Sequence, residues 1–144
     1  VIGLGMIPKD MKYRFNWNSP IVSSPQDPSV MFHGGNKVLK TTNGGMSWEE
    51  ISPDLTRDDK TKQGPGGIPF TIEGAGGENY NTISYLKTSV HDANVLWAGS
   101  DCGLVHLTKD GGKNWEDVTP PSSISPKLNM INCIDLSLIK AGLE

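Results

Sequence analysis

The sequence predicts an all-β protein built from repeated four-stranded antiparallel units. Three observations support this: an octapeptide occurs twice, a short apolar run precedes each copy, and the segments around the two copies also align. The first copy, residues 41–48, reads TTNGGMSW, and the second, residues 108–115, reads TKDGGKNW. A motif that recurs at the same place in a repeated unit is typical of a repeat architecture.

Each octapeptide is interpreted as a tight turn followed by an aromatic anchor. The Gly-Gly pair accepts positive φ angles, and Asn43 or Asp110 can accept hydrogen bonds from the backbone N–H groups that follow it. Apolar and polar residues alternate on both sides, which indicates a hairpin with one buried face. The tryptophans are expected to pack between neighbouring sheets, burying about 150–250 Å² each. The residues given this structural role are Thr41, Asn43, Gly45, Trp48, Thr108, Asp110, Gly112 and Trp115.

The repeat extends beyond the octapeptides. Residues 27–34 (DPSVMFHG) align with residues 92–99 (DANVLWAG) at an offset of 65, whereas the octapeptides are offset by 67. The two additional residues fall within 101–103, which are expected to form a hairpin tip, where a change of length costs least.

Each unit contains four strand candidates. In the first unit they are Trp17–Ser23, Val30–Gly34, Lys37–Thr41 and Ser47–Ser52. In the second unit they are Thr82–Thr88, Val95–Gly99, Leu104–Thr108 and Asn114–Thr119. A third unit is expected to begin with a strand at Met130–Ser137, and only 137–144 has weak helical character. Four short antiparallel strands per unit form the blade of a β-propeller.

The predicted organisation is an incomplete propeller ring. It consists of a lead-in segment (1–12), a blade (13–56), a Gly-rich insertion loop (57–79), a second blade (80–122) and the start of a third blade (123–144). Propellers typically have about four to eight blades, so we expect a piece of a longer protein. Assembly of several copies into one ring is the alternative. In either case, remaining blades or other copies are expected to cover the open blade faces.

Composition excludes several classes of function. The net charge is −3, and the chain contains only two arginines and scattered lysines, so no nucleic-acid partner is expected. No apolar run is long enough to span a bilayer. Cys102 and Cys133 form no CxxC motif, and we treat the placement of His106 four residues after Cys102 as coincidence. We therefore expect no metal and no cofactor. Whether Cys102 and Cys133 form a disulfide is left open by the sequence.

The octapeptide resembles the Asp-box, or bacterial neuraminidase (BNR) repeat, of sialidases, sortilin-type receptors and secreted glycoside hydrolases. More of the chain is similar to large bacterial proteins with sortilin-type propellers that are labelled glycosyl hydrolases. The segments that carry this similarity are 13–21 (YRFNWNSPI), 34–36 (GGN), 51–56 (ISPDLT) and 96–106 (LWAGSDCGLVH). Relatives commonly have two acidic residues where this chain has Asp101-Cys102. The resemblance implies a secreted or periplasmic protein whose Asp-boxes lie at the blade periphery, away from the ligand site. Because folds do not determine function, the hydrolase label does not by itself assign an activity.

A ligand site is predicted where the chain leads into the innermost strands, which line the channel of a propeller. Aromatic rings flanked by amides suit sugars, since the ring stacks on C–H groups while Asn bonds hydroxyls. The ligand-binding candidates are Arg14, Asn16, Trp17, Asn18, Glu78, Tyr80 and Asn81. In the alternative interpretation these asparagines cap turns and these aromatics fill blade interfaces. The long insertion after Arg57 is expected on the same side, because loops of this length are commonly functional.

Catalysis by glycoside hydrolysis requires two carboxyl groups about 5 to 10 Å apart. The weak catalytic candidates are Glu78 and Glu73, while Asp101 is assigned to a hairpin tip. The sialidase resemblance implies a clamp of three arginines, which this chain cannot supply alone. The predicted function is a catalytically incomplete propeller segment that binds glycan or protein. The alternatives are part of a glycoside hydrolase whose carboxylates are shared with missing blades, and an assembly or scaffold propeller that binds a partner protein.

Overall fold

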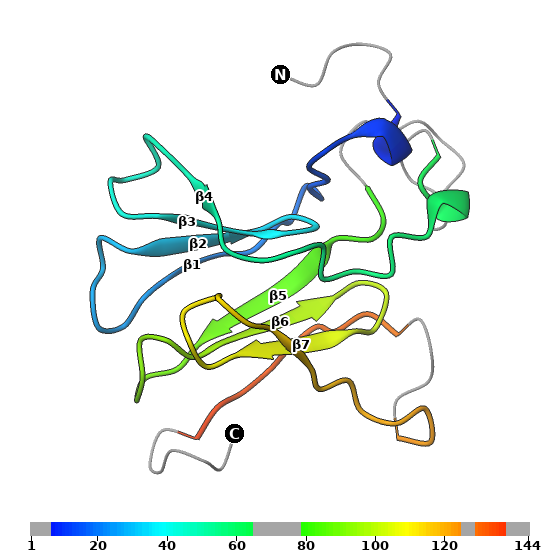
Figure 1. Ribbon diagram of the computed structural model, residues 1–144. Helices are drawn as coiled ribbons and strands as arrows, with labels where there is room; N and C mark the ends of the chain where they lie inside the picture. Colours follow the sequence, from blue (N-terminus) through cyan, green and yellow to red (C-terminus); the bar gives the residue numbers. More distant parts are fainter. Residues whose placement is uncertain (1–6, 65–78, 125–128, 138–144) are drawn as a thin grey trace.

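Two four-stranded antiparallel sheets form the fold (Figure 1). The computed structural model describes residues 7–64, 79–124 and 129–137. The first sheet runs in the order β1 (Ile21–Ser23), β2 (Met31–Gly34), β3 (Val38–Thr41) and β4 (Glu49–Glu50). The second runs β5 (Ile83–Thr88), β6 (Leu96–Ser100), β7 (Val105–Thr108) and β8 (Glu116–Asp117). Within the described ranges, two short 3-10 helices, η1 (Pro8–Asp10) and η2 (Lys60–Lys62), lie outside the sheets. The predicted all-β architecture of four-stranded units is confirmed.

The strand registers of the two sheets repeat with the offsets found in the sequence. Ile21 pairs with His33 in the first sheet, and Leu86 pairs with Ala98 in the second, each shifted by 65 residues. Val38 pairs with Gly34, whereas Val105 pairs with Gly99, so the second hairpin tip is two residues longer. The length difference between the units therefore lies at this tip, as predicted.

Several strands are shorter than the sequence indicates. We predicted a first strand over Trp17–Ser23, but β1 begins at Ile21, because Asn16–Ser19 form a turn in which Ser19 N donates to Asn16 O at 3.1 Å. Pro20 follows this turn and has no N–H for a ladder bond. The outer strands β4 and β8 have two residues each. Within the described residues 129–137 no strand is assigned, although a strand was expected from Met130.

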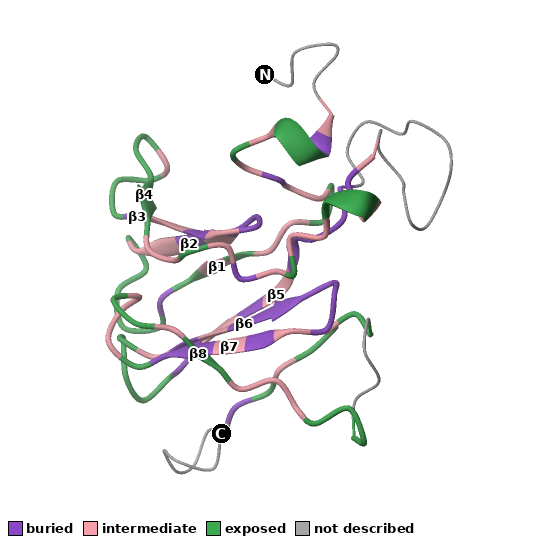
Figure 2. Ribbon diagram, turned by 45° about the vertical axis from the view of Figure 1, so that its right-hand side comes forward, coloured by how far each residue is buried: buried purple, intermediate pink, exposed green. Residues whose placement is uncertain are grey.

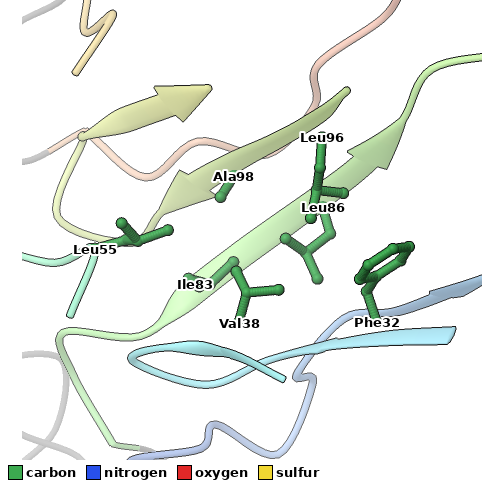
Figure 3. Packing of buried hydrophobic residues seen from close by; sticks show 7 residues of the cluster. All are labelled: Phe32, Val38, Leu55, Ile83, Leu86, Leu96 and Ala98. Carbon is green, nitrogen blue, oxygen red and sulfur yellow. The ribbon is translucent and has the colours of Figure 1, made fainter. Parts of the chain in front are cut away.

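The hydrophobic core lies between the two sheets, so each unit buries one face against the other. In Figure 3, Phe32 and Val38 of the first sheet face Ile83 and Leu86 of the second. The full cluster of buried side chains is Phe32, Val38, Leu55, Ile83, Leu86, Leu96 and Ala98. Burial is concentrated on β5 to β7 and is weaker on β1 (Figure 2). Packing of one sheet face on the next is how propeller blades are stabilised.

A glycine on the second strand of each sheet lets the following segment approach closely. A Cβ at Gly34 would lie 2.9 Å from Ile83 Cγ2, and Ile83 N donates to Gly35 O at 2.7 Å. The same arrangement recurs one unit later. A Cβ at Gly99 would lie 2.3 Å from Ile131 Cγ2, and Ile131 N donates to Ser100 O at 3.0 Å. Residues 129–137 therefore follow the second sheet as β5 follows the first. The assignment of 123–144 to a third blade stays a prediction.

Candidate ligand-binding site

The residues before β1 form a turn that presents Trp17 to solvent. The Trp17 side chain is 76% exposed. Asn16 Oδ1 accepts from Trp17 N at 2.8 Å, and Ser19 Oγ accepts from Asn16 N at 2.9 Å while donating to Asn16 O at 2.6 Å. Together with the Ser19 N bond to Asn16 O, these contacts fix the turn conformation. The turn therefore holds an indole ring in solvent on a rigid backbone.

Two asparagines tie this turn to the segment that leads into β5. Asn16 Nδ2 donates to Asn79 O at 3.1 Å, and Asn79 Nδ2 donates back to Phe15 O at 2.7 Å. The two bonds join residues 63 and 64 positions apart. The structure thus places the two predicted site segments, 14–18 and 79–81, side by side. Asn18 is exposed at the same turn.

Arg14 lies beneath these segments. It is 2% exposed, and its guanidinium contacts Asp54 Oδ2 at 2.7 Å and Asp58 Oδ1 at 3.1 Å. Arg14 Nε also donates to Asn81 O at 3.3 Å. A buried guanidinium is tolerated only when it is paired and hydrogen-bonded, because desolvation of an unpaired charge is expensive. Arg14 therefore holds residues 54–58 and 81 together, and ligand contact by Arg14 would require these pairs to separate.

Tyr80 and Asn81 also lie below the surface. Asn81 adopts a positive φ of 61°, a conformation that Asn tolerates better than most residues. Asn81 Nδ2 donates to Asp59 O at 3.3 Å, while Asn81 Oδ1 has no hydrogen-bond partner among the described residues. Burial raises the pKa of Tyr80 to about 12. Of the predicted ligand-binding residues that are described, Trp17 and Asn18 are the ones that solvent reaches freely.

Asp101 performs a backbone-pairing role that the sequence reasoning missed. Its carboxylate accepts from Thr82 N and from Thr82 Oγ1, both at 3.1 Å, while Asp101 N donates to Thr82 O at 3.0 Å. Asn36 makes the same reciprocal pair with Arg14, accepting from Arg14 N at 2.9 Å and donating N–H to Arg14 O at 2.9 Å. Asn36 and Asp101 are 65 positions apart, which is the offset of the repeat. The repeat alone could therefore have indicated that the two residues have equivalent roles.

Burial raises the pKa of Asp101 to about 7, although hydrogen bonds from Thr82 and Asn81 act in the opposite direction. Next to it, Cys102 is buried, with Sγ 3.1 Å from Ser100 Oγ, and burial raises the pKa of its thiol. Cys102 and the exposed Cys133 are both free thiols, so the disulfide that the sequence left open is absent. Asp101 and Cys102 therefore belong to the buried end of the second sheet.

The two octapeptide turns have matching hydrogen bonds. Asn43 Oδ1 accepts from Thr41 Oγ1 at 2.9 Å and from Ser47 N at 3.0 Å, and Asp110 Oδ1 accepts the equivalent bonds, both at 2.9 Å. Hydrogen bonds from Asn114 lower the pKa of Asp110 to about 2. All four glycines of the turns, Gly44, Gly45, Gly111 and Gly112, have positive φ angles. The carboxylate of Asp110 is therefore engaged in holding a turn.

The two tryptophans of these turns differ in their surroundings. Trp115 Nε1 donates to Ile51 O at 2.8 Å and joins the second unit to the first. Trp48 is 38% exposed and contacts the His33 ring at a centroid distance of 5.8 Å. Trp115 thus packs at the contact between the two units. Trp48 lies on the face of the first sheet that points away from the second sheet.

Some predicted elements of the site have no structural description. Glu73 and Glu78 lie outside the described residues, as does most of the Gly-rich part of the insertion. Within 7–64, 79–124 and 129–137, no group of three or more His, Cys, Asp or Glu residues is arranged to hold a metal ion. Over the same ranges no helix is long and apolar enough to cross a membrane.

Four-stranded antiparallel units that pack face to face define a segment of a β-propeller. The chain resembles the solved structure of an ancestral GH74 enzyme, with a TM-score of 0.50 and 16% sequence identity over 78% of this chain. It spans 11% of that enzyme's length. This likeness supports the propeller fold and does not assign an activity to this chain. A second similar structure is YCF48 from Cyanidioschyzon merolae, with a TM-score of 0.23, 21% identity and coverage of 77% of this chain and 42% of that one. No family model and no curated protein matches the sequence.

Proposed function

We propose that this chain is a ligand-binding segment of a propeller and that its ligand is a neutral glycan held by Trp17. The observation that carries the proposal is the exposed indole on the turn 16–19, which internal hydrogen bonds hold in one conformation. Because the turn backbone is already ordered, binding would restrict only the Trp17 side chain, and the face of its indole can stack on the C–H groups of a sugar. We also propose that the protein lies outside the cell or in the periplasm, because its octapeptides resemble the Asp-boxes of secreted proteins.

The charges near the turn favour an uncharged ligand. The guanidinium of Arg14 is paired with Asp54 and Asp58, and Lys60 Nζ also contacts Asp58 at 2.8 Å. Lys62 pairs with Asp59 at 3.4 Å. No charged side chain among these is available to select an ionic ligand without giving up a partner. A neutral sugar requires hydroxyl partners instead, and the exposed amide of Asn18 can supply them.

The polar surroundings of Trp17 also favour a sugar over a protein. Its sequence neighbours Asn16 and Asn18 are amides, which can bond the hydroxyls of a sugar that stacks on the ring. A protein partner remains the second candidate, because a large exposed aromatic ring is also typical of interface anchors.

We propose no catalysis by this chain alone. Glycoside hydrolysis needs an acid and a second carboxylate on the two sides of the scissile bond. Among the described residues, the candidate Asp101 is buried and bonded to Thr82. A hydrolase that combines Glu78 or Glu73 with carboxylates from further blades is the alternative function.

The proposal predicts that Trp17→Ala weakens glycan binding at least about tenfold, equivalent to about 1.4 kcal/mol. Binding is measured by affinity electrophoresis and calorimetry against a panel of soluble neutral polysaccharides. Ile124→Ala is the matched control, because Ile124 is equally exposed at 76% and should leave binding unchanged. Asn18→Ala should cause a smaller loss than Trp17→Ala.

Three results separate the alternatives. Equal glycan binding by the wild type and Trp17→Ala would rule out the proposed site. Absence of glycan binding together with a purified protein partner that requires Trp17 would favour the scaffold function. Release of reducing ends that stops with Glu78→Gln would favour the hydrolase.

A further inference from the structure

The two innermost strands begin at equivalent residues. Asn36 accepts from Arg14 N at 2.9 Å and donates its own N–H to Arg14 O at 2.9 Å. Asp101, at the equivalent position, accepts from Thr82 N at 3.1 Å and donates to Thr82 O at 3.0 Å. Arg14 and Thr82 therefore mark the same point in the two blades.

Beyond this point the first blade contains an insertion. Gly34 N donates to Pro20 O at 2.9 Å, and Gly99, which is offset from Gly34 by 65, pairs with Tyr85. Pro20 and Tyr85 thus mark a second common point. Five residues, 15–19, lie between the two points in the first blade, whereas two lie between them in the second. The three additional residues coincide with the turn that carries the exposed indole.

The sheets do not require these three residues. β1 pairs with β2, and β5 pairs with β6, in the same antiparallel arrangement with and without them. In the described stretch 129–137, which enters beside the second sheet, no turn is assigned either. Trp17 is 76% exposed, so the insertion adds nothing to the core. Insertions in repeat proteins lie in loops on one face, which is often the binding face.

The segment that leads into β5 supports the inserted turn through Asn79. This residue is 7% exposed, and its Nδ2 donates to Phe15 O at 2.7 Å. Its backbone O accepts from Asn16 Nδ2 at 3.1 Å. Two residues later, Asn81 O accepts from the buried Arg14 Nε at 3.3 Å, so the supporting backbone is itself anchored. The turn of the first blade is therefore held by residues that belong to the entry of the second.

We propose that Asn79 is a positioning residue of the glycan site, an inference that rests on the proposed function. Asn79 acts through the turn rather than through contact with the sugar. It fixes Phe15 and Asn16, the two residues that precede Trp17. The site is then a composite of two blades, with the indole supplied by one and its support by the entry to the next. It is complete only when the two blades are packed together.

Loss of the Asn79 amide would release the turn. Without the bond to Phe15 O, the backbone before Trp17 has one anchor fewer and samples other conformations. Affinity falls with the fraction of molecules in the binding-competent conformation. Loss of one hydrogen bond corresponds to a change of about fivefold in such an equilibrium.

Gln26 offers a matched control at the opposite end of β1. Its Nε2 donates to Ser89 O at 3.0 Å, so it also joins a side chain to the backbone of the other blade, over 63 positions. The bond is of the same kind as the bond from Asn79 to Phe15 O, but β1 separates it from Trp17. Asn79→Ala and Gln26→Ala should both lower the urea midpoint, and only Asn79→Ala should affect the turn.

Two measurements test the proposal. In NMR experiments without glycan, the backbone amides of Trp17 and Ser19 should exchange about fivefold faster in Asn79→Ala and at the wild-type rate in Gln26→Ala. Against the same panel of neutral polysaccharides, Asn79→Ala should bind about fivefold more weakly than the wild type, while Gln26→Ala should match the wild type. Asn79→Asp should bind no better than Asn79→Ala, because an ionised carboxylate cannot donate to Phe15 O.

Each outcome decides between the two proposals. Unchanged exchange at Trp17 and Ser19 in Asn79→Ala would overturn the positioning role, whether or not a glycan binds. Wild-type affinity of Asn79→Ala, in a protein whose binding requires Trp17, would overturn it as well. Equal losses of affinity in Asn79→Ala and Gln26→Ala would reduce Asn79 to a residue of general stability. Binding that survives Trp17→Ala would instead sink the proposed function, and the exchange rates alone would then decide whether Asn79 holds the turn.

Discussion

Replacement of Asp101 by Asn should remove a pH dependence from the stability of the second blade. Asp101 is buried, and its pKa rises from an ordinary 3.8 to about 7 because burial disfavours the charged form. When the folded pKa of an acid lies above its unfolded value, the folded state binds more protons between the two values. Stability is then greatest below pH 4 for this group, falls as the pH rises toward 7, and levels off above it.

The magnitude follows from the two pKa values. A rise from 3.8 to about 7 corresponds to about 4 kcal/mol of unfolding free energy at about 1.4 kcal/mol per pH unit. Asn suits the site because Asn36 already occupies the equivalent position and accepts from Arg14 N at 2.9 Å. Asp101→Asn should therefore match the wild type near pH 4 and exceed it by up to about 4 kcal/mol at pH 8.

Urea unfolding between pH 4 and 8.5 measures this difference directly. Burial lowers the pKa values of His33 and His106, so these two residues make stability rise with pH in part of the same range. Both proteins carry these histidines, so the contribution cancels in the difference between wild type and Asp101→Asn. Asp135→Asn controls for the loss of a charge, because the Asp135 side chain is 87% exposed. Parallel stability curves for the wild type and Asp101→Asn would refute the raised pKa of the buried Asp101.

Two further predictions concern polar groups that hold backbone in place. Arg14→Ala should lower the unfolding free energy by about 3–5 kcal/mol, because it leaves a partly buried Asp54 without its cation. Arg14→Lys should restore little of this stability, since Lys cannot reproduce the forked contacts of a guanidinium. Both variants are measured by urea denaturation, and a loss under about 1 kcal/mol for Arg14→Ala would contradict the role of Arg14 in holding these segments together. Asn43→Asp should raise the thermal midpoint at neutral pH, because Ser47 Oγ can donate to the new carboxylate as Asn114 does to Asp110. Since the pKa of Asp110 is lowered to about 2, that gain should be present above pH 4 and vanish as the pH falls toward 2, and a lower midpoint at pH 7 would count against it.

Local patterns in the sequence predicted the units of this fold well. The octapeptides located the turns after β3 and β7, and the change of offset from 65 to 67 located the longer hairpin tip. These features are readable because turns and alternating strands depend on residues near one another in the chain. The beginning of β1 was misplaced, since the turn at Asn16–Ser19 depends on side-chain bonds that periodicity does not reveal.

The candidate site was less predictable. Its two segments were identified as neighbours of the innermost strands, but the bonds from Asn16 to Asn79 O and from Asn79 to Phe15 O join residues far apart in sequence. Arg14 was predicted as a ligand contact because it lies in a segment that leads into an innermost strand, whereas its burial depends on Asp54 and Asp58, which follow the outer strand. Composition alone gives no sign of such long-range pairing. The exposure of Trp17 was not predictable either, because Trp17 was expected to begin a strand and the structure places it in a turn.

The two sheets meet through side chains of different size near the inner and the outer strands. Near the inner strands the spacer is Gly34, against which Ile83 packs without an intervening side chain. Toward the outer strands the gap is filled by the indole of Trp115 on Ile51. A larger side chain at Gly34 would meet Ile83 and force the sheets apart near the inner strands, and a smaller side chain at Trp115 would remove a contact near the outer strands. We expect either change to alter the angle between the two sheets.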